Sequence, residues 1–232
     1  MRIGVSSYSF SQAMRDGRMT ILDVIPTAKG MGYEGVEIVK FCSDEEMREY
    51  APKLAAQSKE FEMPIIAYMV GADFLANGVA AQVETLKKEV EIAATLGAHR
   101  MRHDATGGKD ATGKAYTWEE ALPILAEGYG RVTEYAMGLG INTMIENHGY
   151  FAQDAARVKS LIEAVGNRNF GWLVDMGNFM CADETPVASV AIAAPLAAHA
   201  HAKDFHFKKK GEFVPKHGWF STRGGDSLRG AM

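Results

Sequence analysis

The stretch LPILAEGYGRVTEYAMGLGINTMIE, residues 122–146, contains one repeat of the pattern that decides the fold. Apolar side chains recur in its first part at intervals of three and four residues, which predicts a helix with one buried face. Gly140 then follows as a helix C-cap, and residues 141–146 form a short apolar run typical of a buried strand. A helix that leads through a glycine into a strand is typical of an α/β protein. The apolar positions of the helix are Leu122, Leu125, Tyr129, Val132, Ala136 and Leu139.

The same pattern recurs along the chain. Apolar helical faces precede Gly97 and Gly166, each of which leads into another apolar run. Serine or threonine followed three residues later by glutamate, at 43–46 and 117–120, predicts two further helix starts, and Thr185-Pro186 predicts another. Pro52 is expected to bend or split the second helix. The predicted strands are residues 3–8, 35–39, 64–70, 98–103, 141–146, 170–175 and 199–203.

Strands that alternate with helices at roughly thirty-residue spacing predict a parallel sheet. An open doubly wound sheet and a closed barrel both fit this order. The first strand-to-helix turn, residues 6–10, has no glycine-rich phosphate loop, which weakens the dinucleotide-binding alternative. We therefore favour a (β/α)8 TIM-type barrel, of which residues 1–232, expected as a single domain, supply seven strands.

Composition narrows the class of partner. The 25 lysines and arginines against 29 aspartates and glutamates give a net charge of −4, which argues against a nucleic-acid partner and favours a small molecule. No apolar run approaches the roughly twenty residues that cross a bilayer. Cys42 and Cys181 lie far apart, and the N-terminus lacks the layout of a secretion signal, so we expect a cytoplasmic protein without a membrane partner. A homo-oligomer is compatible with the sequence.

Functional side chains of a parallel barrel lie at the C-terminal ends of its strands, and these positions are polar here. Carboxylates and imidazoles that arrive together from neighbouring strands need a compensating charge, which a divalent cation supplies. We predict Glu146, Asp175 and His201 as its ligands. Any one of them alone is more typical of a cap or a surface charge, but three on consecutive strands favour a metal site. Two carboxylates and one histidine suit Mn²⁺, Mg²⁺, Co²⁺ or Zn²⁺.

Further polar and aromatic residues near the strand ends are candidate substrate contacts. Lys203 is also a candidate catalytic residue, since its ammonium would stabilise a developing negative charge. Ion pairs with Asp104 or Asp204 are the alternative for the histidines and the lysine. Residues 208–223 are expected to form a long loop after the seventh strand. The predicted substrate contacts are Tyr8, Glu37, His103, His148, Asn178 and Arg223.

Three segments of this chain, MIENHG at 144–149, LVDMGNF at 173–179 and HAHAKD at 199–204, resemble the xylose isomerase-like sugar phosphate isomerases and epimerases. IGVS at 3–6 and GYEGVE at 32–37 support the resemblance, which covers essentially the whole chain. It implies metal ligation by Glu146, Asp175, His201 and a second glutamate that ends strand eight. It also implies chemistry in which the two glutamates move a proton on the carbon next to a carbonyl, through an enediolate.

The resemblance places the last helix and the eighth strand, with the second glutamate, after residue 232. We therefore expect the natural protein to continue beyond this chain. Many relatives carry a histidine at the position of Asn178, and asparagine cannot act as a base.

Isomerisation or epimerisation of a sugar or related polyhydroxy carbonyl compound is the leading hypothesis, with Glu146 as the base. A metal-dependent dehydratase acting on a cyclic polyol or keto acid is the first alternative, because it begins with the same proton abstraction. Phosphodiester hydrolysis, as in the endonuclease IV relatives of the barrel, needs several metals and more histidine ligands, and the seven histidines and the acidic balance of this chain argue against it. A sugar-binding barrel that has lost catalysis is the remaining alternative.

Overall fold

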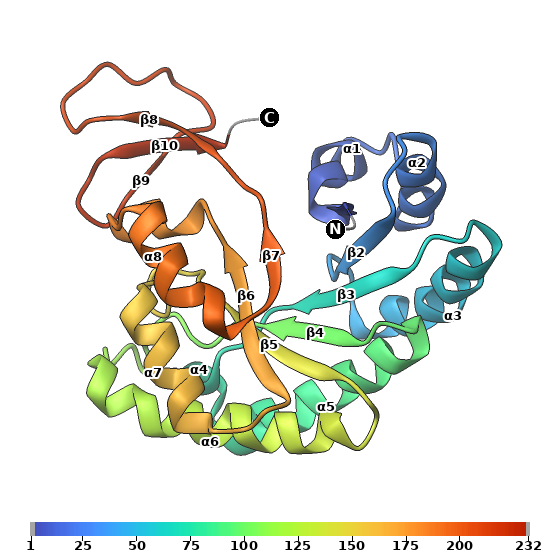
Figure 1. The fold of residues 1–232 in the computed structure, drawn as a ribbon, viewed down its shortest axis with the longest axis horizontal. Helices are drawn as coiled ribbons and strands as arrows, with labels where there is room; N and C mark the ends of the chain where they lie inside the picture. Colours follow the sequence, from blue (N-terminus) through green and yellow to red (C-terminus); the bar gives the residue numbers. More distant parts are fainter. Residues whose placement is uncertain (1–2, 231–232) are drawn as a thin grey trace. The chain divides into compact units, whose positions relative to one another are not determined.

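A computed structural model describes residues 3–230 of the chain (Figure 1). Seven strands form one sheet in sequence order, β1-β2-β3-β4-β5-β6-β7. The recorded registers within it are parallel, as between Asp175 and His201. Each predicted strand overlaps an observed one, although the seventh begins and ends two residues earlier than expected. The strands are β1 (Gly4–Ser6), β2 (Gly35–Val39), β3 (Ile65–Val70), β4 (Arg100–His103), β5 (Asn142–Glu146), β6 (Phe170–Asp175) and β7 (Ala197–His201).

Helices occupy the connections between these strands. The α-helices are α1 (Ser11–Arg15), α2 (Val24–Gly30), α3 (Asp44–Glu60), α4 (Phe74–Asn77), α5 (Val79–Leu96), α6 (Trp118–Met137), α7 (Ala155–Val165) and α8 (Pro186–Ala193). The 3-10 helices are η1 (Ser7–Phe10), η2 (Ile21–Asp23), η3 (Asn178–Ala182) and η4 (Ala194–Leu196). This alternation of parallel strands and helices is the architecture predicted from the sequence.

Local sequence signals account for the helix ends. Ser43 N donates to Glu46 Oε2 at 2.9 Å and Glu46 N donates to Ser43 Oγ at 3.2 Å, so the predicted capping box forms. Gly97, Gly140 and Gly166 all adopt positive φ after their helices, a conformation that glycine takes without strain. The proline inside α3 does not split that helix, which runs unbroken from Asp44 to Glu60.

Contacts divide the chain into two compact units, which are described separately. The first comprises the residues up to Gly71 with Val83–His103 and Arg131–Thr143. Its core contains a polar group, because Tyr68 is fully buried and its hydroxyl donates to Glu89 Oε2 at 2.7 Å. Burial and the charge of Glu89 both raise the pKa of Tyr68, so the phenol stays protonated and remains a donor.

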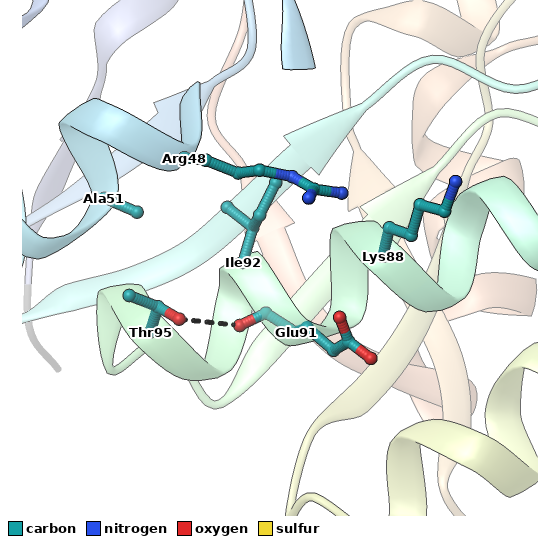
Figure 2. A pocket seen from close by; sticks show the side chains of 6 residues that line it. All are labelled: Arg48, Ala51, Lys88, Glu91, Ile92 and Thr95. Atoms are coloured by element: carbon teal, nitrogen blue, oxygen red, sulfur yellow. Dashed lines mark hydrogen bonds between the residues drawn. The ribbon is translucent and has the colours of Figure 1, made fainter. Parts of the chain in front are cut away.

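A hollow of about 160 Å³ lies on the surface of the first unit, between α3 and α5 (Figure 2). Arg48 and Lys88 flank it and are exposed to solvent, while Ala51 and Ile92 also line it. Thr95 Oγ1 donates to the Glu91 carbonyl at 2.9 Å, a bond within α5. The hollow therefore carries solvated charges and none of the predicted site residues.

The second unit comprises Ala72–Gln82, Asp104–Gly130 and the chain from Met144 onward. Helices α7 and α8 pack against β6 (Figure 1). The ring of Tyr129 lies between those of Phe74 and Phe170, with centroid separations of 5.4 Å and 4.8 Å. Gly128 makes this packing possible, since a Cβ there would lie 2.5 Å from the Phe74 ring. The single domain expected for residues 1–232 stays a prediction.

After β7 the chain forms a separate antiparallel sheet with the order β8-β10-β9. Its strands are β8 (Phe205–Lys208), β9 (Phe220–Ser221) and β10 (Ser227–Gly230). The expectation of one long loop over 208–223 is therefore wrong at its ends. Leu228 is fully buried and clusters with Phe205 and Cys181, so an apolar cluster anchors this sheet. Among the described residues, none of the helices is both long and apolar enough for a membrane span.

Candidate metal centre

The three predicted ligands end three consecutive strands, since Glu146 closes β5, Asp175 closes β6 and His201 closes β7. His201 Nδ1 lies 3.7 Å from Glu146 Oε1 and 3.7 Å from Asp175 Oδ2. One ligand atom from each side chain lies within 4.8 Å of the other two. The Asp175 side chain is 2% exposed, that of Glu146 is 9% exposed and that of His201 is 26% exposed. The structure thus brings the predicted triad together.

The donor set of the triad fits a divalent cation. Two carboxylate oxygens and one imidazole nitrogen are ligands that Mn²⁺, Co²⁺ and Zn²⁺ accept, and Mg²⁺ accepts the oxygens. Two donors that each lie about 2.1 Å from one ion are separated by at most ~4.2 Å, which the 3.7 Å spacings of His201 satisfy. The two carboxylates also lie close to one another, an arrangement that a cation stabilises.

Backbone amides fix the orientation of Asp175. Its Oδ1 accepts hydrogen bonds from Gly177 N at 3.0 Å and Asn178 N at 2.9 Å. Its Oδ2 lies 3.7 Å from His201 Nδ1 and 3.9 Å from Lys203 Nζ. The turn after β6 therefore holds one oxygen and directs the other towards His201 and Lys203.

Asn178 links the predicted catalytic residues. Its Nδ2 donates to Glu146 Oε1 at 3.1 Å, and its Oδ1 accepts from Lys203 Nζ at 2.9 Å. Asn178 is 2% exposed and the Glu146 side chain 9%, so the bond between them is largely shielded from water, whereas the Lys203 side chain is 41% exposed. Asn178 therefore orients Glu146 and Lys203 through both ends of its side-chain amide.

Comparison with known proteins places this chain in a family. The family described as xylose isomerase-like TIM barrel matches residues 25–224. The chain belongs to that family. The TIM-barrel fold expected for the chain is confirmed by this family match and by the order of its parallel strands. A search of curated protein sequences finds no match.

Solved structures share the fold of this xylose isomerase-like chain. The IOLI protein with a binding zinc atom has a TM-score of 0.73 and 16% identity, over 89% of this chain and 74% of that one. The probable 3-DHS dehydratase AsbF from Bacillus anthracis has a TM-score of 0.72 and 17% identity, over 88% and 74%. A D-psicose 3-epimerase has a TM-score of 0.70 and 19% identity, over 92% and 77%. At these identities the likeness extends to the fold alone.

Asn147 is a residue of the candidate site in this xylose isomerase-like chain, and its role was not predicted from the sequence. It is fully buried, and its Nδ2 donates to the Asp175 carbonyl at 2.8 Å. Its Oδ1 accepts from Asp175 N at 3.0 Å and from Trp172 Nε1 at 3.1 Å. One side chain thus binds both backbone polar groups of Asp175. The sequence signal that could have revealed this role is the position of Asn147, a polar residue directly after the apolar strand β5.

His148 lies at the rim, outside the triad. Its Nδ1 is 3.0 Å from Asp104 Oδ1, so the histidine contacts the aspartate that the sequence offered as its alternative partner. The imidazole is 49% exposed and lines a hollow of about 190 Å³ with Asp104, Thr106 and Gly107. A role in contacting substrate hydroxyls stays a prediction.

The remaining predicted substrate contacts are placed as follows. Arg223 forms hydrogen bonds with Asp154 and with the Tyr150 carbonyl. Tyr8, Glu37 and His103 belong to the first unit. Tyr8 is 65% exposed with its ring 6.0 Å from that of Phe41, whereas Glu37 and His103 are buried. Contact of any of these residues with a substrate stays a prediction.

Replacing Gly177 with alanine is expected to destabilise the site. A Cβ at this position would lie 2.7 Å from the Lys203 carbonyl oxygen, and a backbone atom cannot move away cheaply. We expect a loss of about 1–3 kcal/mol of unfolding free energy, measured by urea denaturation. Gly130→Ala in α6 is the matched control, because a Cβ there meets nothing within 4 Å. Equal stability of the two variants would show that the turn tolerates the added methyl.

Proposed function

We propose that this protein is a divalent-metal-dependent isomerase or epimerase of a sugar or related polyhydroxy carbonyl compound. The observation that carries the proposal is the convergence of Glu146, Asp175 and His201, whose ligand atoms lie within 4.8 Å of one another. Membership of the xylose isomerase-like family supports the reaction class. The shared fold of a D-psicose 3-epimerase and an L-ribulose 3-epimerase supports a sugar substrate.

In this proposal Glu146, Asp175 and His201 hold the cation. When bound, the cation supplies Lewis-acid polarisation of a carbonyl group. Mn²⁺, Mg²⁺, Co²⁺ and Zn²⁺ are the proposed candidates. The shared fold of the IOLI protein, whose structure contains a zinc atom, supports the presence of a metal.

Glu146 is the proposed base, which removes a proton from the carbon next to the substrate carbonyl. The Asn178 amide holds its Oε1 at 3.1 Å and so limits rotation of the carboxylate. Lys203 is the proposed stabiliser of the negative charge that then develops on the substrate oxygen. Its side chain is 41% exposed and can therefore reach a substrate from the rim.

A dehydratase is the second candidate, because the probable 3-DHS dehydratase AsbF shares the fold. Elimination of water from a polyol or keto acid also begins with proton removal next to a carbonyl. Mass analysis of products separates the two reactions, since isomerisation conserves the mass and elimination loses one water.

The remaining parts of the proposal concern the partner, the cellular location and the oligomeric state of the protein. We propose a small polyol or sugar as the partner, a cytoplasmic location and the possibility of a homo-oligomer. Cys42 and Cys181 are both free thiols, which suits a reducing compartment. A sugar-binding barrel without turnover is the non-catalytic alternative to this proposal.

Proton exchange tests the proposed function whatever the product. The protein is loaded with each candidate cation in deuterated water and given ketoses, aldoses and their phosphates. We expect deuterium at the carbon next to the carbonyl of at least one compound, and its loss on addition of a chelator. A protein that binds the cation but exchanges no proton in any compound would favour the non-catalytic alternative.

A further inference from the structure

Residues 221–224, which we call the strap, lie across two parts of the second unit. Arg223 Nη1 donates to Asp154 Oδ1 at 2.6 Å and Nη2 donates to Asp154 Oδ2 at 3.0 Å. Nη2 also donates to the Tyr150 carbonyl. The guanidinium thus binds the turn between β5 and α7 in its middle, at Tyr150, and at its end, where it forms a bidentate pair with the Asp154 carboxylate.

The strap is also fixed to η3, the turn that follows β6. Arg223 N donates to the Cys181 carbonyl at 2.9 Å, and Gly224 N donates to Asp183 Oδ2 at 2.5 Å. The Tyr150 hydroxyl donates to the Ser221 carbonyl at 2.7 Å. The strap therefore connects the turn after β5 to the turn after β6.

Two residues that the strap contacts have strained backbones. Tyr150 has φ 63° and Asp183 has φ 61°, in the left-handed region that non-glycine residues enter at a cost. Such conformations persist where surrounding contacts hold them. The strap supplies contacts of this kind to both residues.

A chain of hydrogen bonds leads from the strapped turn to Glu146. Tyr150 N donates to Gln153 Oε1 at 2.6 Å, and Gln153 Nε2 donates to the Asn178 carbonyl at 2.7 Å. The Asn178 amide then donates to Glu146 Oε1 at 3.1 Å. Gln153 is 2% exposed, so these bonds face little competition from water.

Arg223 and Asp154 are both charged near neutral pH, so their ion pair persists there. Burial raises the pKa of Asp154, but the hydrogen bonds and charge of Arg223, together with a backbone hydrogen bond and the charge of Arg157, leave this pKa below its usual value. The bond to Asp154 raises the pKa of Arg223. Because the folded-state pKa of Asp154 is lowered, the pair stabilises the fold above about pH 4 and loses this contribution as the pH falls through the lowered value.

We infer that Arg223 is a positioning residue for Glu146, acting through Tyr150, Gln153 and Asn178. Arg223 holds the turn in which Gln153 lies, Gln153 fixes the backbone of Asn178, and the Asn178 side chain fixes the carboxylate of Glu146. The inference rests on the proposed function of Glu146 as metal ligand and base. It gives Arg223 a role different from the substrate contact predicted from the sequence.

Arg223→Gln tests the inference with Co²⁺ alone as the probe. Residues that orient metal ligands typically contribute about 10- to 100-fold to metal affinity or activity. We expect Co²⁺ affinity to fall roughly tenfold with an altered absorption spectrum, and kcat to fall more than KM rises. Arg223→Lys keeps the charge and a single donor group. Its Co²⁺ affinity and its kcat should therefore lie between those of the wild type and Arg223→Gln. Arg168→Gln is the matched control, since Arg168 is exposed in the turn before β6.

A double variant examines the route through Gln153. If Arg223 acts through this side chain, Arg223→Gln combined with Gln153→Ala should bind Co²⁺ about as well as Gln153→Ala alone. Fully additive losses of affinity would overturn the route. A raised KM in Arg223→Gln with unchanged Co²⁺ affinity and spectrum would overturn the inference in favour of a substrate contact.

Hydrogen exchange separates failure of this inference from failure of the proposed function. We expect faster amide exchange at Tyr150 and Gly224 in Arg223→Gln, with or without metal. Unchanged amide exchange would refute the proposal that Arg223 holds these turns in place, even if the enzyme is active. A wild-type protein that binds no divalent cation would instead refute the proposed function. Arg223→Lys provides the same exchange measurement if Arg223→Gln does not fold.

Discussion

Replacing Glu146 with glutamine is expected to reduce turnover by about 10²–10⁴-fold, the usual contribution of a general acid or base. The amide cannot remove a proton at neutral pH, but its oxygen can still accept the Asn178 hydrogen bond that Glu146 Oε1 accepts at 3.1 Å. The local structure should therefore survive the substitution. Steady-state kinetics on the substrate found by proton exchange gives the measurement.

The same variant should bind the cation more weakly, because one negative charge is lost while Asp175 and His201 stay in place. Calorimetric titration with Mn²⁺ measures this effect separately from turnover. Glu163→Gln is the matched control, since Glu163 lies on α7 with a 61% exposed side chain. Unaltered turnover in Glu146→Gln would refute the assignment of Glu146 as the base.

Replacing Asn147 with alanine is expected to produce the largest loss of stability, about 3 kcal/mol. The substitution removes a fully buried side chain and leaves Trp172 Nε1 and both backbone polar groups of Asp175 without the bonds that Asn147 provides. Each buried polar group left unsatisfied costs about 1–3 kcal/mol. In a chain of this size such a loss lowers the melting temperature by roughly 6–12 °C, which calorimetry measures.

Asn167→Ala is the matched control for Asn147. Asn167 lies partly exposed before β6, where its Oδ1 accepts a hydrogen bond from Asn169 N at 2.9 Å. Its replacement should cost less than about 1 kcal/mol, since water can take over the lost bond. Similar melting temperatures for the two variants would contradict the structural role given to Asn147.

The strands of the parallel sheet were predictable because their signals are local. Apolar runs, capping residues and glycines after helices each act within a few residues, and Gly97, Gly140 and Gly166 all adopt the expected positive φ. The antiparallel sheet was not predicted, because the pairing of β8 with β10 joins segments separated by a long connection. The alternation of Phe205 and Phe207 with polar residues was a local signal for β8.

The candidate ligands were predictable for a different reason. In a parallel sheet the ends of consecutive strands meet at one edge, so Glu146, Asp175 and His201 had to lie near one another once the strands were placed. The side chains that orient them were not predictable in the same way. Asn147 and Gln153 bind backbone groups that are distant in sequence, and such partners depend on tertiary packing.

The two oxygens of Asp175 have separate tasks. Oδ1 accepts two backbone amides of the turn after β6, whereas Oδ2 lies towards His201 and Lys203. An aspartate held in this way offers a cation one oxygen and resists becoming a chelating, two-oxygen ligand. If Asp175, Glu146 and His201 hold a cation as proposed, Asp175 would bind it through Oδ2 alone and would keep Oδ1 for the backbone of the turn after β6. The position of that ligand would then depend on the conformation of the turn.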